Sequence, residues 1–78
     1  MIVKICKSDF HQVGILEAVE VEYHEHKGNA IIHCMHNKFM VSNMTKDEYN
    51  NILENFYNTG VFDFTGYRTG VIQGFNGR

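Results

Sequence analysis

The stretch ILEAVEVEYHEHKGNAIIHCMH, residues 15–36, decides the expected fold. Residues 15–26 alternate between two sets of side chains, and this period of two is typical of a half-buried strand. Gly28 and Asn29 both tolerate a positive φ and predict a turn, after which residues 30–36 form the next strand. The stretch therefore predicts a β-hairpin.

The register of this hairpin depends on the length of its turn. With a two-residue turn, His24 faces His33 and Tyr23 faces Cys34. One face of the hairpin then carries an apolar set, namely Val19, Val21, Tyr23, Ala30, Ile32 and Cys34. A three-residue turn would bring His33 into this set, so we prefer the register that buries less polarity.

Two further strands are predicted, one before and one after the hairpin in the chain. Residues 2–6 are short and β-branched and predict a first strand. Residues 39–44 follow a second expected turn and predict a fourth strand, in which Met40 faces Met35. Phe39 and Val41 then continue the apolar face.

A helix follows the fourth strand. Residues 45–48, TKDE, form a capping box, in which Thr45 caps the helix and Glu48 reaches back to the cap. Apolar residues then recur at helical spacing, at Tyr49, Ile52, Leu53, Phe56 and Tyr57. Gly60 is expected to end the helix, whose apolar stripe should pack on the sheet.

The C-terminal segment contributes one short strand and a tail. Residues 61–64 predict the strand, and residues 65–78 contain four glycines and predict a glycine-rich loop or tail. We therefore expect an α+β fold, with an antiparallel sheet of four to five strands and one helix packed on one face. The order is β-β-β-β-α-β, and residues 1–64 form a single domain.

Composition restricts the function. The formal charge of −2 and the scattered basic residues argue against duplex DNA as a partner. Lys4 and Lys7 interrupt the apolar residues of the N-terminus, so we expect no membrane span and a cytoplasmic location. Cys6 and Cys34 lack C-x-x-C spacing, and we expect reduced thiols.

The histidines of the hairpin form one candidate metal site. Two histidines on one strand, His24 and His26, and His33 on the next would supply three ligands for Zn²⁺. Polar histidines on a solvated sheet face are the alternative, which we prefer, and we expect no cofactor. No nucleophile stands beside an assignable base, so we expect no catalytic residues and no enzyme activity.

The face opposite the expected core points to a partner. It gathers flexible apolar side chains beside two histidines, and such patches are typical of adaptable protein-binding surfaces. The expected partner-binding residues are Ile31, His33, Met35, Met40, Met44 and His24. A homodimer is also compatible with this face, as is packing under the tail or the first strand.

The sequence therefore favours a small non-enzymatic protein-binding module, such as a regulator or inhibitor of a larger protein. The composition would suit a phage or mobile-element product. The first alternative is a histidine metal-binding domain. The second is single-stranded nucleic-acid binding by the tail, through Tyr67, Arg68, Phe75 and Arg78.

Overall fold

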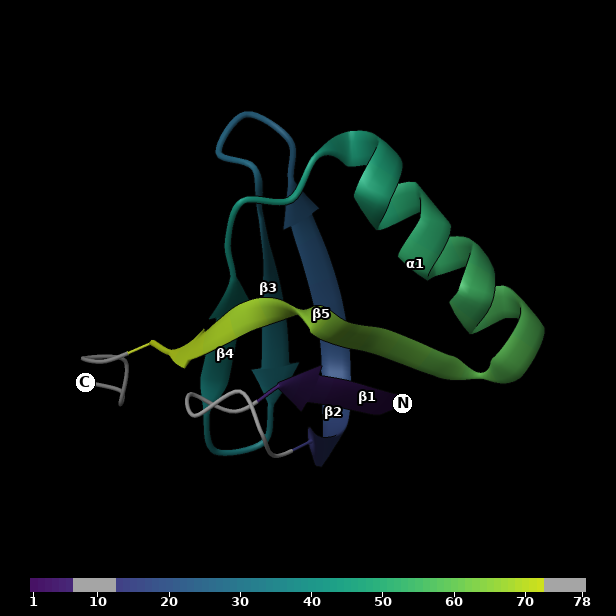
Figure 1. Cartoon of the computed structure of the whole chain (residues 1–78). Helices are drawn as coiled ribbons and strands as arrows, with labels where there is room; N and C mark the ends of the chain where they lie inside the picture. The colour runs from purple at the N-terminus through teal and green to yellow at the C-terminus, as the bar shows by residue number, and fades with distance from the viewer. Residues whose placement is uncertain (7–12, 73–78) are drawn as a thin grey trace.

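The computed structural model describes residues 1–6 and 13–72, which form five strands and one helix (Figure 1). In chain order these are β1 (Ile2–Cys6), β2 (Val13–His24), β3 (Asn29–Cys34), β4 (Lys38–Val41), α1 (Lys46–Thr59) and β5 (Val61–Val71). The predicted α+β class and the order β-β-β-β-α-β are confirmed. No helix in this part of the chain has both the length and the apolar character needed to cross a membrane.

The five strands close into a small barrel in the order β1-β2-β3-β4-β5. All neighbouring strands are antiparallel except β1 and β5, which are parallel. β5 begins beside β1 and ends beside β4, where Thr69 pairs with Val41. The prediction of a tail from residue 65 is therefore wrong for residues 65–71, and residues 73–78 lie outside the described residues.

The glycines of β5 explain this difference. The register between β1 and β5 shifts between Lys4 and Cys6, whose partners are Asp63 and Arg68, and Gly66 lies in the irregular stretch of β5 between these two partners. Glycine within a strand commonly marks a bulge or bend, because it has no side chain to obstruct it. A glycine that predicted a loop therefore lies at an irregularity within a strand.

The β2–β3 turn has four residues between His24 and Asn29, not two. The amides of Lys27 and Gly28 both donate to the carbonyl of His24, at 3.1 and 2.9 Å, and Gly28 has a φ of 67°. His24 therefore pairs with Asn29, and the predicted pairing with His33 is wrong. The pairing moves by an even number of residues, so side chains from Glu20 to His24 keep their expected faces.

The β3–β4 turn is also longer than expected. The amide of Cys34 donates to the carbonyl of Asn37 across it, at 2.9 Å. Met40 consequently pairs with Ile31, and Met35, its predicted partner, lies in the turn. The predicted Met35–Met40 pair is therefore wrong.

A β-bulge in β2 changes which residues face the interior. Ala18 pairs with Cys34 while Glu20 pairs with His33, so Val19 is an extra residue. Ala18 is 3% exposed, whereas Val19 is 69% exposed. The predicted core position of Val19 is wrong, because the bulge turns its side chain outward.

The barrel interior and one face of α1 form a single apolar core. Its buried members are Val3, Ile5, Ala18, Ala30, Ile32, Val41, Met44, Ile52, Phe62 and Phe64. From α1, Phe56 stacks on Phe62 with ring centroids 4.2 Å apart, and Tyr49 stacks on Tyr23 at 4.6 Å. Of the predicted helical stripe, only Tyr57 points to solvent.

Both ends of α1 have the predicted caps. The amide of Thr45 donates to Glu48 Oε1 at 2.8 Å, and the amide of Glu48 donates to Thr45 Oγ1 at 3.2 Å. Gly60 has a φ of 80°, and its amide donates to the carbonyl of Phe56. The caps fix where α1 begins and ends, and thus where its polar side chains lie beside β5.

Candidate functional site

The outer face of β2, β3 and β4 carries four of the six residues predicted to bind a partner. Ile31 and Met40 are cross-strand neighbours here, and both are half-buried. In the adjacent set of cross-strand neighbours, His33 lies between Glu20 on β2 and Lys38 on β4. His24 lies farther along β2, so the face combines aliphatic side chains with groups of both charges.

Glu22 lies between two of the histidines on this face. Its Oε1 is 2.6 Å from His33 Nε2 and 3.9 Å from His24 Nε2. The hydrogen bond with His33 is the main cause that holds the pKa of Glu22 below its usual value. The three side chains, which we call the Glu22 cluster, form a compact polar network.

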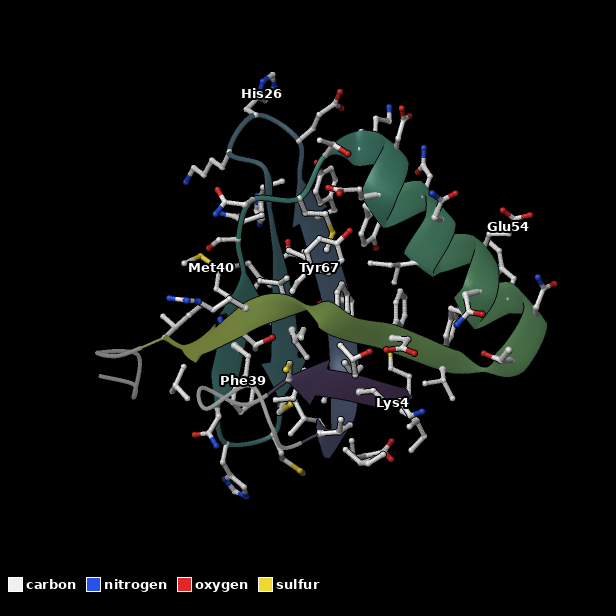
Figure 2. The ribbon with its side chains drawn as sticks, in the orientation of Figure 1. Lys4, His26, Phe39, Met40, Glu54 and Tyr67 are labelled. Carbon is white, nitrogen blue, oxygen red and sulfur yellow. The ribbon has the colours of Figure 1, made fainter. Side chains whose placement is uncertain are left out.

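The three-histidine metal set is not brought together. His26 lies at the tip of the β2–β3 turn (Figure 2), whereas His24 and His33 flank Glu22. Within residues 1–6 and 13–72, no group of three or more His, Cys, Asp or Glu side chains is placed to hold a metal ion.

Met35 and Met44, the other predicted partner-binding residues, lie elsewhere. Met35 is 79% exposed in the β3–β4 turn, and Met44 is 2% exposed. Met44 is held inside because its amide donates to Gly28 at 2.9 Å and its carbonyl accepts from the Tyr23 hydroxyl at 2.8 Å. The expected exposure of Met44 is therefore wrong.

A set of exposed aliphatic residues on β1 and β2, with Lys4 and Glu17 among them, was missed by the sequence analysis. It consists of Ile2, Val13, Ile15 and Val19, which are 38, 58, 60 and 69% exposed. We call it the apolar patch. Before the bulge, the even-numbered residues of β2 face the core, so the odd-numbered ones face solvent. The only signal for the apolar patch in the sequence was the opposite assignment of faces at the start of β2, with Gly14, Leu16 and Ala18 inside.

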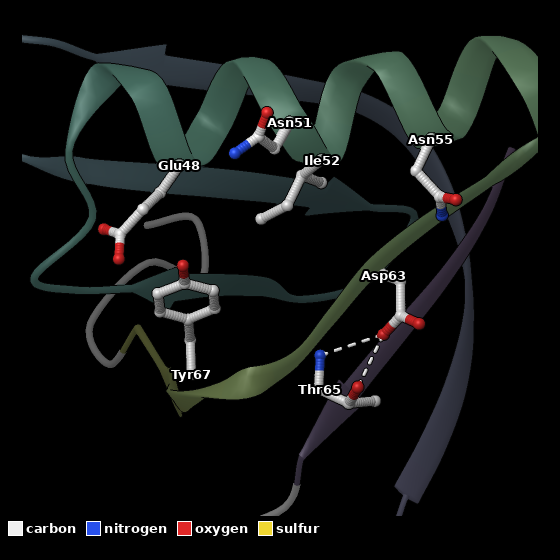
Figure 3. Close-up of a pocket in the computed structure, with 7 residues that line it drawn as sticks. All are labelled: Glu48, Asn51, Ile52, Asn55, Asp63, Thr65 and Tyr67. Atoms are coloured by element: carbon white, nitrogen blue, oxygen red, sulfur yellow. Dashed lines mark hydrogen bonds between the residues drawn. The ribbon is translucent and has the colours of Figure 1, made fainter.

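A polar groove of about 380 Å³ lies between α1 and β5 (Figure 3). The helix lines it with residues spaced three or four apart, and the strand lines it with alternate residues. These are Glu48, Asn51, Ile52, Asn55, Asp63, Thr65 and Tyr67. We call it the α1–β5 groove, and the sequence analysis missed it because residues 65–67 were expected in a tail.

Hydrogen bonds lower the pKa of both carboxylates of the α1–β5 groove and so favour their ionised forms. Asp63 Oδ1 accepts from the hydroxyl and the amide of Thr65, at 2.6 and 3.1 Å, and these bonds, the hydroxyl's first, lower the pKa of Asp63. The amide of Thr45 is the main cause that lowers the pKa of Glu48. Burial and then a hydrogen bond to Glu48 raise the pKa of Tyr67.

The proposed nucleic-acid tail is divided by the structure. Tyr67 lines the α1–β5 groove, and Arg68 lies exposed on β5. Phe75 and Arg78 lie outside the described residues. The four side chains are therefore not shown to share one surface.

Comparison of the chain with protein-family models, curated proteins and solved structures gives no match. A proposal for the function of the chain therefore rests on its own surfaces.

Proposed function

We propose that the chain is a small non-enzymatic protein-binding module, with the apolar patch at the centre of its contact surface. The supporting observation is the exposure of three aliphatic side chains on one strand, Val13, Ile15 and Val19. Clustered exposed aliphatic residues mark protein contact sites, because each gains about 25 cal/mol for every Å² of apolar surface removed from water.

The charges around the apolar patch suggest the partner's chemistry. Three acidic residues lie along the same outer face of β2, at Glu17, Glu20 and Glu22. Glu17 already binds the N-terminal ammonium at 2.9 Å, and Glu22 binds His33. A complementary partner presents aliphatic side chains flanked by a basic group opposite Glu20, since complementary charges favour the correct pairing.

The predicted partner-binding residues would extend this surface beyond the bulge. Ile31 and Met40 provide aliphatic area on β3 and β4, and His24 and His33 adjoin them. A regulatory or inhibitory role, a phage or mobile-element origin and a cytoplasmic location stay predictions from the sequence.

The test is affinity capture with a double lysine variant and a matched control. Ile15→Lys/Val19→Lys should abolish capture, because the contact would desolvate two ammonium groups. Tyr57→Lys is the control, since Tyr57 is 74% exposed on α1 and lies outside the patch. Circular dichroism checks that each variant folds. Capture that survives the double variant unchanged would exclude the apolar patch.

A second pair of measurements defines the extent and occupant of the surface. Met35→Lys/Met40→Lys tests whether the contact reaches β3 and β4. Light scattering of the purified chain measures its mass, and a dimer that dissociates in Ile15→Lys/Val19→Lys would identify the occupant as a second copy. A monomer whose capture of another protein depends on Ile15 and Val19 would support a different partner.

A further inference from the structure

We infer that the α1–β5 groove binds a linear dication, a ligand with two basic nitrogens roughly 10 Å apart. The inference stands apart from the proposed function, because none of the apolar patch residues lines this groove. It rests on the placement of two carboxylates at opposite ends of a groove that has an aliphatic side chain between them.

The length of the groove sets the spacing of the two basic groups. Glu48 and Tyr67 lie at one end, and Asp63 and Asn55 lie at the other (Figure 3). Asn55 follows Glu48 by seven positions on α1, which corresponds to about 10 Å at 1.5 Å per residue. A single cation therefore cannot contact both carboxylates, whereas a linear dication of this length can.

The two carboxylates are fixed before any ligand arrives. Asp63 is held by Thr65 through Oδ1, and its Oδ2 makes none of these bonds. Glu48 is held by the amide of Thr45 and by Tyr67. Ordering these groups in advance reduces the entropy lost on binding, so each carboxylate can receive an ammonium or guanidinium group at little further cost.

The middle of the groove suits the spacer of such a ligand. Ile52 lies between the two acidic ends and offers apolar contact to methylene groups (Figure 3). The side-chain amides of Asn51 and Asn55 make no hydrogen bond to another described residue. Both side chains are exposed, so either amide can turn its oxygen toward an N–H group of the ligand.

Lys4 competes with the ligand at one end. It pairs with Asp63 across β1 and β5, and its positive charge helps to lower the pKa of Asp63. A cation bound at Asp63 is therefore repelled by Lys4. Removing the Lys4 charge should strengthen binding, whereas removing either carboxylate charge should weaken it.

The experiment is a titration of the ¹⁵N-labelled chain with 1,7-diaminoheptane, a linear dication, at low salt, followed by amide chemical shifts. Saturable shifts are expected in residues 48–55 and 63–67. Two control amines, 1,3-diaminopropane and propylamine, should bind more weakly, because the first is too short to span the groove and the second has one charge. Binding should weaken as salt is added.

Four charge variants test the residues themselves. Glu48→Gln keeps a residue that a capping box accepts, and Asp63→Asn keeps the Oδ1 acceptor. Each should lower the affinity for 1,7-diaminoheptane roughly two- to fivefold, the range for exposed ion pairs. Lys4→Gln should raise it. Glu54→Gln is the matched control, because it removes the same charge from the side of α1 that faces away from β5 (Figure 2).

Two ligand sources share this chemistry, and the same titration separates them. A blocked extended peptide with two arginines two residues apart places both on one face about 7 Å apart, and their long side chains can splay to reach both carboxylates. Tighter binding of the peptide assigns the groove to a protein segment, and tighter binding of 1,7-diaminoheptane assigns it to free diamines. The inference fails if Glu54→Gln weakens binding as much as Asp63→Asn, if propylamine binds as tightly as 1,7-diaminoheptane, or if the shifts lie outside the groove.

Discussion

The Thr69 hydroxyl provides a direct test of the barrel interior, because it is buried without a hydrogen-bond partner. Thr69 is 7% exposed, and its Oγ1 has no partner among the described residues. Valine has the same branched shape without the hydroxyl. A buried hydroxyl without a partner costs about 1–3 kcal/mol, so Thr69→Val should stabilise the fold by about 1 kcal/mol or more.

Thermal unfolding by circular dichroism measures this effect. For a domain of this size, 1 kcal/mol raises the midpoint by roughly 4–8 °C. Thr65→Val is the matched control and should lower the midpoint, because the Thr65 hydroxyl donates to Asp63 Oδ1 at 2.6 Å. A lower midpoint for Thr69→Val would refute the reasoning, since it would mean that the hydroxyl has a partner, such as a bound water.

Two further predictions concern the core and the pH dependence of stability. Phe64→Ala should lower the free energy of unfolding, measured in urea, by about 3–5 kcal/mol, because Phe64 is fully buried. Tyr57→Ala, on the exposed face of α1, should change it by no more than about 0.5 kcal/mol. The lowered pKa of Asp63 means that its ionised form stabilises the fold above the usual carboxyl pKa. That contribution is lost as the pH falls through the folded-state pKa. Acid unfolding curves of wild type and Asp63→Asn should therefore converge at low pH, and a constant gap between them would contradict the assignment.

The sequence predicted the elements well, because their signals are local. Thr45 and Glu48 cap α1 through bonds within one turn, and Gly60 ends the helix as expected. Alternation also identified the faces of the β2–β3 hairpin. Its register was wrong because the turn depends on a distant contact, in which the Gly28 carbonyl accepts from the amide of Met44. No pattern within the hairpin indicates that contact.

The candidate surfaces were only partly predictable for the same reason. Ile31, Met40 and the Glu22 cluster share the expected outer face, because an even register change preserves faces. The apolar patch depends on the bulge at Val19, which one extra residue creates against β3. The α1–β5 groove requires that residues 65–67 be a strand, and β5 is fixed by nonlocal pairing with β1 and β4.

The parallel pairing of β1 and β5 has a consequence for synthesis on the ribosome. Ile2 pairs with Val61, so the first strand meets its second neighbour only after nearly the whole described chain has emerged. Until then, β1 and β4 each present an unpaired edge, and such edges pair readily with other chains. Contacts this distant in sequence also slow folding. We therefore expect chains that end before Val61 to aggregate, and β5 to protect the nascent protein as well as complete its barrel.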